Sequence, residues 1–215
     1  GNILGGEQSG FIADIGYDTY QKILDEAIEE LKQSDFKELF DQDDQPKDGT
    51  HFVQEVQLET DQELLIPTHY IVSTQERLYL YSRFNDLKDE EGIEAFAKEL
   101  RDRFGRLPKQ VYELFNGLRV KWLSRPLGFE RVILKNKKLR CYFVMNPQSP
   151  FYETDVFGKI LALLSAGENP HNINIKKSKD YLILAVDHVN NLKTALEILE
   201  WLSGEVLVEE LSEHG

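Results

Sequence analysis

The segment Phe129-Glu-Arg-Val-Ile-Leu-Lys-Asn-Lys-Lys-Leu-Arg-Cys-Tyr-Phe-Val-Met145 decides the fold class of this chain of 215 residues. Two runs rich in β-branched and aromatic residues, 129–135 and 139–145, flank Asn136-Lys-Lys138. A short polar segment between two such runs is typical of a tight turn between paired strands. The segment therefore predicts a β-hairpin.

Amphipathic helices are predicted on both sides of this hairpin. Apolar residues recur at helical spacing before it and after it, and short β-rich runs lie between the later helices. The predicted helices cover 17–32, 74–87, 89–104, 108–124, 155–165 and 191–202, and the further strands cover 52–58, 173–175 and 181–186. This order predicts an α+β fold in which helices pack on a small sheet, preceded by a helical arm.

A domain boundary is predicted near residue 50. Residues 41–49 combine four aspartates with Pro46 and Gly49, which is typical of a linker. The aspartates do not form an EF-hand, because Pro46 stands where that loop needs glycine and Phe52 where it needs glutamate. We therefore expect an arm with an acidic linker over 1–49 and a C-terminal α+β domain over 50–215, with residues 1–16 poorly anchored.

Charge and composition narrow the class of protein. The net charge is −13, yet residues 76–150 carry 16 basic and 10 acidic side chains. An acidic surface repels phosphates, so a free-standing nucleic-acid binder is disfavoured unless the basic middle forms one face. No apolar run approaches the roughly 20 residues that span a bilayer, and no secretory signal opens the sequence. We therefore expect no membrane contact and, with a single cysteine, a cytoplasmic location.

No catalytic, metal-binding or cofactor motif is present in the sequence. The five histidines share no metal-like spacing, and Cys141 lies in an apolar strand, which predicts a buried, inert thiol. Gly5 and Gly10 have the spacing of a phosphate loop, but Phe11 and Ile12 replace its lysine and hydroxyl residue. The sequence thus predicts no catalytic residues, no metal and no cofactor for this chain alone.

One charged cluster lies on the predicted helix 89–104. Glu99, Asp102 and Arg103 project away from its apolar stripe, and Glu99 has the i,i+4 spacing to pair with Arg103. Asp102 has only Lys98 as a basic neighbour four residues back, so we expect a cation from outside the helix.

A second charged cluster lies on the predicted hairpin. Lys135, Lys137 and Lys138 could contact phosphates, which would make the chain an autonomous DNA-contacting module. Solvated turn lysines that discourage aggregation are the plainer interpretation.

An enzyme is the other alternative that the sequence leaves open. Its site would be assembled from scattered residues such as His69, Tyr70 and His188.

Several motifs, in this order, resemble the C-terminal region of bacterial transcription-repair coupling factors. They are Gly-Asn-Ile-Leu-Gly-Gly-Glu-Gln-Ser-Gly10, Ile15-Gly-Tyr-Asp-Thr-Tyr20, Glu76-Arg-Leu-Tyr-Leu-Tyr-Ser-Arg-Phe84 and Glu99-Leu-Arg-Asp-Arg-Phe-Gly105. The resemblance runs nearly end to end, close through about residue 126 and loose beyond it. No single motif is decisive, but their ordered combination is specific.

The resemblance implies a regulatory role. Proteins of this family couple an ATP-dependent DNA translocase, which pushes stalled RNA polymerase, to an N-terminal module that recruits UvrA. Their C-terminal domain packs on that UvrA-binding module within the same protein and restrains it. DNA would then be contacted only through the motor of the full-length protein, and this chain would not be an enzyme by itself.

The resemblance also implies roles for particular residues. Gly5, Gly6, Gln8 and Gly10 match the loop that ends the translocation motif shared with RecG. Glu99 and Asp102, with Arg103 beside them, match the acidic positions that face basic residues of the UvrA-binding module.

Overall fold

The computed structural model describes residues 48–167, 169–179 and 181–207. The chain divides into two compact units, 1–46 and 47–215, and every described residue belongs to the second unit. The predicted arm and its motif residues Gly5, Gly6, Gln8 and Gly10 lie outside the described residues. The predicted boundary near residue 50 therefore stays a prediction.

A mixed five-stranded sheet is the centre of the described unit, in the strand order β1-β2-β3-β5-β4. Strand β1 pairs in parallel with β2, and the other neighbours pair antiparallel. The strands are β1 (Gln57–Thr60), β2 (Phe129–Lys135), β3 (Lys138–Phe143), β4 (Asn174–Ser178) and β5 (Tyr181–Asp187).

The predicted hairpin is confirmed as the pair β2–β3. Its turn consists of Asn136 and Lys137, which both have positive φ, 53° and 58°. Two such residues match the twist of paired strands, so the connection is as short as a hairpin allows. Lys138 already belongs to β3 and pairs with Lys135.

Five α-helices and two 3₁₀ turns complete the described unit. Side-chain caps on four of the α-helices explain where they begin, because Ser73, Asp89, Thr154 and Asn191 each accept a hydrogen bond from a first-turn N–H. The elements are η1 (Gly49–His51), α3 (Thr74–Asp86), α4 (Glu90–Phe104), α5 (Lys109–Ser124), η2 (Pro150–Glu153), α6 (Asp155–Ser165) and α7 (Leu192–Val206). The predicted α+β class is confirmed.

The strand predicted over 52–58 is largely wrong. Residues 49–51 form η1, and only 57–60 pair in the sheet. The N–H of Gly49 donates to the Pro126 carbonyl at 2.8 Å, and Arg125 Nε donates to the Val53 carbonyl at 2.8 Å. The segment therefore packs on the corner between α5 and β2 instead of extending along a strand.

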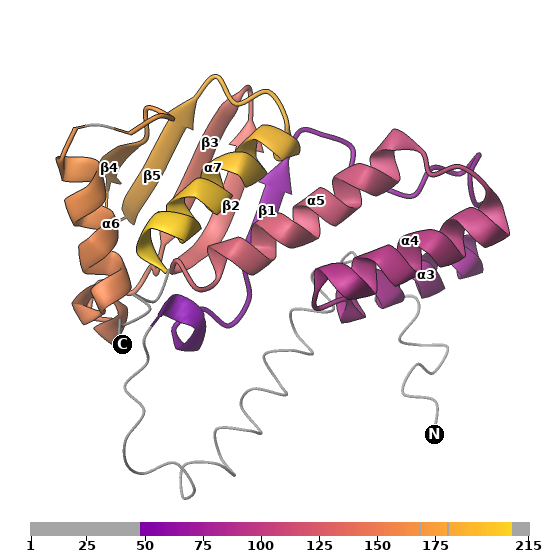
Figure 1. Ribbon diagram of the computed structural model, residues 1–215, viewed down its shortest axis with the longest axis horizontal. Helices are drawn as coiled ribbons and strands as arrows, with labels where there is room; N and C mark the ends of the chain where they lie inside the picture. The colour runs from indigo at the N-terminus through magenta and orange to yellow at the C-terminus, as the bar shows by residue number, and fades with distance from the viewer. Residues whose placement is uncertain (1–47, 168, 180, 208–215) are drawn as a thin grey trace, which may run out of the picture. The chain divides into compact units, whose positions relative to one another are not determined.

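Two hydrophobic clusters stabilise the unit. Helices α5, α6 and α7 pack on one face of the sheet (Figure 1), against inward side chains such as Val132, Cys141 and Leu184. The second cluster joins α3, α4 and the first half of α5, where the rings of Phe84, Phe96 and Phe115 meet at centroid distances of 4.9 to 6.3 Å. Helix α5 contributes to both clusters.

Candidate interaction surfaces

Two ion pairs join α3 to α4 along a line that we call the α3–α4 seam, made of Glu76, Tyr79, Arg83, Glu99 and Arg103. Arg83 Nη1 donates to Glu99 Oε1 at 2.6 Å, and Arg103 Nη2 donates to Glu76 Oε1 at 2.7 Å. Tyr79 lies one helical turn from both Glu76 and Arg83 and is 57% exposed. The predicted i,i+4 pair of Glu99 and Arg103 is present, but at the longer distance of 3.9 Å.

The charged side chains of the seam find their partners largely within the domain. The hydrogen bond from Arg83 holds the pKa of Glu99 below its usual value, and the same bond raises the pKa of Arg83. The Arg83 guanidinium also lies 4.6 Å from the Phe96 ring centroid. Glu99 therefore already has a cation inside the domain, which the helical spacing alone did not reveal.

Asp102 differs from its neighbours on α4. It is exposed, and no hydrogen bond or ion pair joins it to any residue that the structure describes. Of the predicted trio of Glu99, Asp102 and Arg103, Asp102 is thus the one whose charge is available to another molecule. The assignment of the trio to a domain interface stays a prediction.

Exposed apolar side chains lie on α3 and just before it. Val72 is 82% exposed, and Leu78 and Tyr79 follow on α3. Sequence reasoning treated 74–87 only as a helix and missed these residues. Because Leu80 and Phe84 form the buried side of α3, the neighbouring tyrosine and leucine could have been identified as outward-facing.

The hairpin lysines lie at one end of the sheet. Lys135 and Lys138 are register partners and therefore share a face, while Lys137 occupies the turn. Lys135 Nζ lies 3.4 Å from Glu59 Oε2, and Arg131 donates to the same carboxylate at 2.6 Å. One acid on β1 thus partly neutralises two of the cations on β2.

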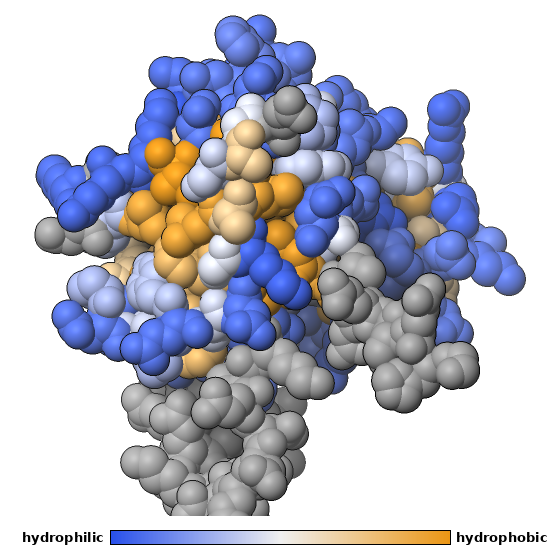
Figure 2. Space-filling view, turned by 60° about the vertical axis from the view of Figure 1, so that its left-hand side comes forward, coloured by the Kyte–Doolittle hydropathy of each residue, from blue (hydrophilic) through white to orange (hydrophobic). Residues whose placement is uncertain are grey.

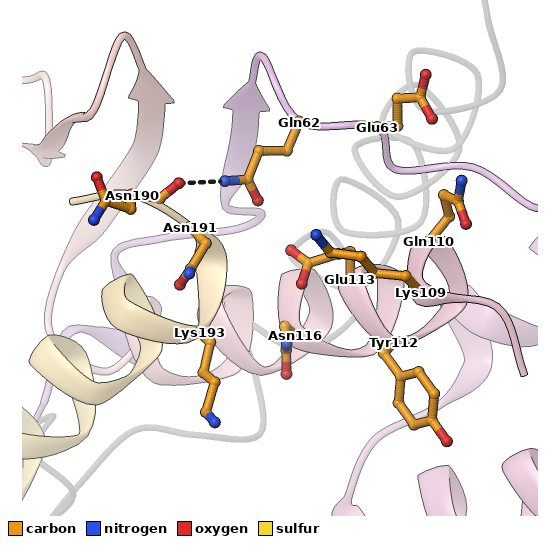
Figure 3. A pocket seen from close by; sticks show the side chains of 10 residues that line it. All are labelled: Gln62, Glu63, Lys109, Gln110, Tyr112, Glu113, Asn116, Asn190, Asn191 and Lys193. Carbon is orange, nitrogen blue, oxygen red and sulfur yellow. Dashed lines mark hydrogen bonds between the residues drawn. The ribbon is translucent and has the colours of Figure 1, made fainter.

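A polar cleft of about 730 Å³ opens between the loop after β1, the first turns of α5 and the start of α7 (Figure 3). Gln62 closes one side, since its Nε2 donates to the Asn190 carbonyl at 2.9 Å and its Oε1 accepts from the Leu192 N–H at 3.3 Å. The lining residues are Gln62, Glu63, Lys109, Gln110, Tyr112, Glu113, Asn116, Asn190, Asn191 and Lys193. These amides, ammonium groups and carboxylates can bind polar groups, but they include no nucleophile beside a base.

Apolar side chains also gather in a patch on the side of the molecule that carries α6 (Figure 2). This helix is apolar over much of its circumference, with Leu161, Leu163 and Leu164 half-buried around its inward residues.

Of the residues considered for catalysis, His69 and Tyr70 are neighbours in the segment before α3, and His188 belongs to another part of the fold. Tyr70 donates its hydroxyl to the Leu100 and Gly105 carbonyls and packs in the helical cluster, whereas His188 follows β5. The predicted buried thiol is confirmed, because Cys141 is inaccessible and burial raises its pKa to about 12. Within the described ranges, no group of three or more His, Cys, Asp or Glu side chains could hold a metal ion, and no helix is long and apolar enough to cross a membrane.

Comparison with known proteins shows which domain this chain is similar to. Residues 60–154 match the family model for the TRCF domain, which covers α3, α4, α5 and the hairpin. A solved structure described as the C-terminal domain of transcription-repair coupling factor superposes with a TM-score of 0.58 at 21% identity, covering 73% of this chain and 96% of that one. The fold is thus that of the solved domain.

The chain is also similar in sequence to transcription-repair-coupling factors of several bacteria. The chain is 28% identical over 216 residues to the transcription-repair-coupling factor of Staphylococcus haemolyticus, covering 98% of the chain. It is 34% identical over 125 residues to that of Bacillus subtilis, covering 58% of the chain and 10% of the relative. The predicted resemblance to the C-terminal region of transcription-repair-coupling factors is confirmed. The chain spans only 16% of the length of the Staphylococcus haemolyticus relative.

Proposed function

We propose that this domain docks on the UvrA-binding module of its own full-length protein and restrains both UvrA recruitment and the DNA translocase motor. The similarity to the TRCF domain supports a place within a transcription-repair-coupling factor, and the α3–α4 seam with Asp102 supplies a surface for docking. The observation that carries the proposal is the exposed carboxylate of Asp102, for which the described residues offer no cation. By itself the chain would not be an enzyme, and DNA, RNA polymerase and UvrA would be reached through the rest of the protein.

The chemistry of the seam suits a contact that must open. Docking within one protein benefits from a high effective concentration, so a weak interface suffices. Charged groups at such an interface fix its register, and dissolved salt screens them. Engagement of RNA polymerase or DNA by the remaining domains could therefore break the contact without unfolding either partner.

Tyr79 gives this interface an anchor. An exposed tyrosine offers a large rigid ring at low entropic cost, and aromatic residues dominate the binding energy of many interfaces. The ion pairs of Glu76 and Arg83 hold the helix on which Tyr79 lies. We expect Tyr79 to contribute apolar contact area while Asp102 contributes charge.

Titration calorimetry between this chain and the separate UvrA-binding module tests the surface. Asp102→Arg should weaken binding at least tenfold, which corresponds to about 1.4 kcal/mol. It should leave the fold intact because Asp102 has no partner among the described residues. Glu197→Arg, on the exposed side of α7, is the matched charge reversal and should bind like the unmodified chain.

Different outcomes test the docking surface and the restraining role. Equal binding by Asp102→Arg and the unmodified chain would show that docking uses another face. In the full-length protein, the same substitution should raise UvrA binding and ATP turnover. If removing residues 47–215 changes neither quantity, the domain does not restrain the protein.

A further inference from the structure

The face of the sheet opposite α5, α6 and α7 carries its own pattern of side chains, which we call the open sheet face. Register partners on neighbouring strands share a face. One row across the sheet reads Arg131, Tyr142, Ile183 and Lys176, and another reads Lys135, Lys138 and Asp187. In the described part of the chain, no helix lies against these rows (Figure 1).

Two tyrosines lie on this face. The rings of Tyr142 on β3 and Tyr181 on β5 meet nearly edge to face, with centroids 6.1 Å apart. The guanidinium of Arg131 lies 5.6 Å from the Tyr142 ring centroid, and Tyr181 is 38% exposed. Neither tyrosine belongs to a hydrophobic cluster of the described core. The pair therefore presents aromatic surface that packing of the domain does not use.

Positive charge surrounds these rings. The strands place five cations on the open sheet face against two acids, Glu59 and Asp187. The cations are Arg131, Lys135, Lys138, Arg140 and Lys176. Arg140 donates to Asp187 at 2.8 Å and is the main reason that the pKa of Asp187 is lowered, with Lys176 and Lys138 adding to the effect. A chain with a net charge of −13 thus carries a basic face on its sheet.

We propose that the open sheet face binds single-stranded nucleic acid, with phosphates at Lys138, Arg140 and Lys176 and a base stacked on Tyr181. A basic surface with interleaved aromatic rings is the arrangement that holds single strands without reading their sequence. This face of the sheet carries no helix that could enter a duplex groove, which favours binding of unpaired bases. An acidic protein would form ion pairs with the cations, but its carboxylates would not need the aromatic surface of the tyrosine pair.

This proposal refines the hairpin alternative that the sequence left open. The hairpin supplies Lys135 and Lys138 at one edge of the surface, while Lys176 and Tyr181 come from β4 and β5. It is independent of docking through the seam, because it uses another face and other residues.

Fluorescence anisotropy of the 215-residue chain with a labelled 12-nucleotide oligothymidine tests the proposal. Binding should weaken between 50 and 200 mM salt, since each neutralised phosphate releases counterions. Lys176→Gln should reduce the affinity about threefold to tenfold and lower the salt slope by about 0.7. Lys177→Gln is the matched control, because the adjacent residue pairs with Leu182 on the opposite face of the same strand.

A second pair of variants tests the ring. Tyr181→Ala should weaken binding roughly fivefold or more, while Tyr181→Phe should retain it, because stacking needs the ring and not the hydroxyl. Circular dichroism of each variant checks that the sheet is intact. Equal effects of Lys176→Gln and Lys177→Gln would overturn the proposal, as would unchanged binding by a folded Tyr181→Ala. Binding of polyglutamate but not of the oligonucleotide would assign the face to an acidic protein instead.

Discussion

Gly128 offers a sharp test of how tightly the sheet layer is packed. It is buried in the turn immediately before β2 and has a φ of +84°. A Cβ at this position would overlap Cζ and Cε2 of the Phe151 ring. The Phe151 ring is fully buried, and the rings of Phe143 and Phe157 lie at centroid distances of 6.1 and 5.6 Å. The ring therefore cannot easily move away from an added methyl group.

The expected cost of Gly128→Ala has two parts. Placing alanine in the left-handed region costs about 1 to 2 kcal/mol. Forcing a methyl group into a packed core costs about 1 to 3 kcal/mol more, because rings must leave their preferred positions. The free energy of unfolding should therefore fall by about 2 to 5 kcal/mol, a large share of the total for a domain of this size.

Urea unfolding followed by tryptophan fluorescence measures this change, with two control variants. Gly167 also has a positive φ, +79°, but no atom lies within 4 Å of a Cβ placed there, so Gly167→Ala should cost only the backbone part, about 1 to 2 kcal/mol. Gly158→Ala lies in α6 in open space and should stabilise the domain by about 0.5 to 1 kcal/mol. If Gly128→Ala costs no more than Gly167→Ala, the reasoning about the Phe151 contact is wrong.

Three further outcomes follow from the described contacts. A chain of residues 54–215 should have a free energy of unfolding about 1 to 3 kcal/mol lower than a chain of residues 47–215, because it lacks η1, the hydrogen bond between Gly49 and Pro126 and the hydrogen bond from Arg125 to the Val53 carbonyl; equal denaturation midpoints of these two chains would contradict this. A double-mutant cycle of Arg83→Ala and Glu99→Ala should give a coupling of about 0.2 to 1 kcal/mol at pH 7, the range for exposed pairs. Because the fold lowers the pKa of Glu99, this stabilisation is present above its ordinary value of 4.5 and is lost as the pH falls through the lowered pKa, so a coupling that stays unchanged once the Glu99 carboxyl is protonated would be inconsistent with it. Cys141 should resist a thiol reagent at pH 8 until the domain unfolds, because burial raises its pKa to about 12; rapid reaction of the folded chain would show that the thiol is accessible.

The helices and the hairpin could be predicted because their signals are local. Apolar spacing and capping residues fix helices such as α4, where Asp89 caps the first turn and Gly105 with its φ of 87° ends the last. The beginning of the domain could not be predicted in this way. Phe52 and Val56 have the spacing of a strand, but a backbone hydrogen bond to Pro126, more than 70 residues away, decides their course.

For the candidate surfaces too, features within one helix could be predicted, whereas contacts between separate elements could not. Spacing on α4 correctly separated Glu99 and Asp102 from the apolar stripe of the helix. It could not show that Glu99 bonds to Arg83, because that contact depends on how α3 crosses α4. The open sheet face could not be predicted from the sequence either, because Tyr142 and Tyr181 meet only through the pairing of β3 with β5.

Helix α5 determines how the two candidate surfaces act together. Its first half packs Val111 and Phe115 into the cluster beneath the seam, and its second half packs Val120 into the cluster beneath the sheet. Both clusters are close-packed and therefore resist small relative movements. A partner bound at the seam and a strand bound at the open sheet face would thus be held at a fixed separation by one rigid element. If both proposals hold, the two ligands should bind independently to the isolated domain, and any competition between them in the full-length protein must arise from contacts that the other domains make.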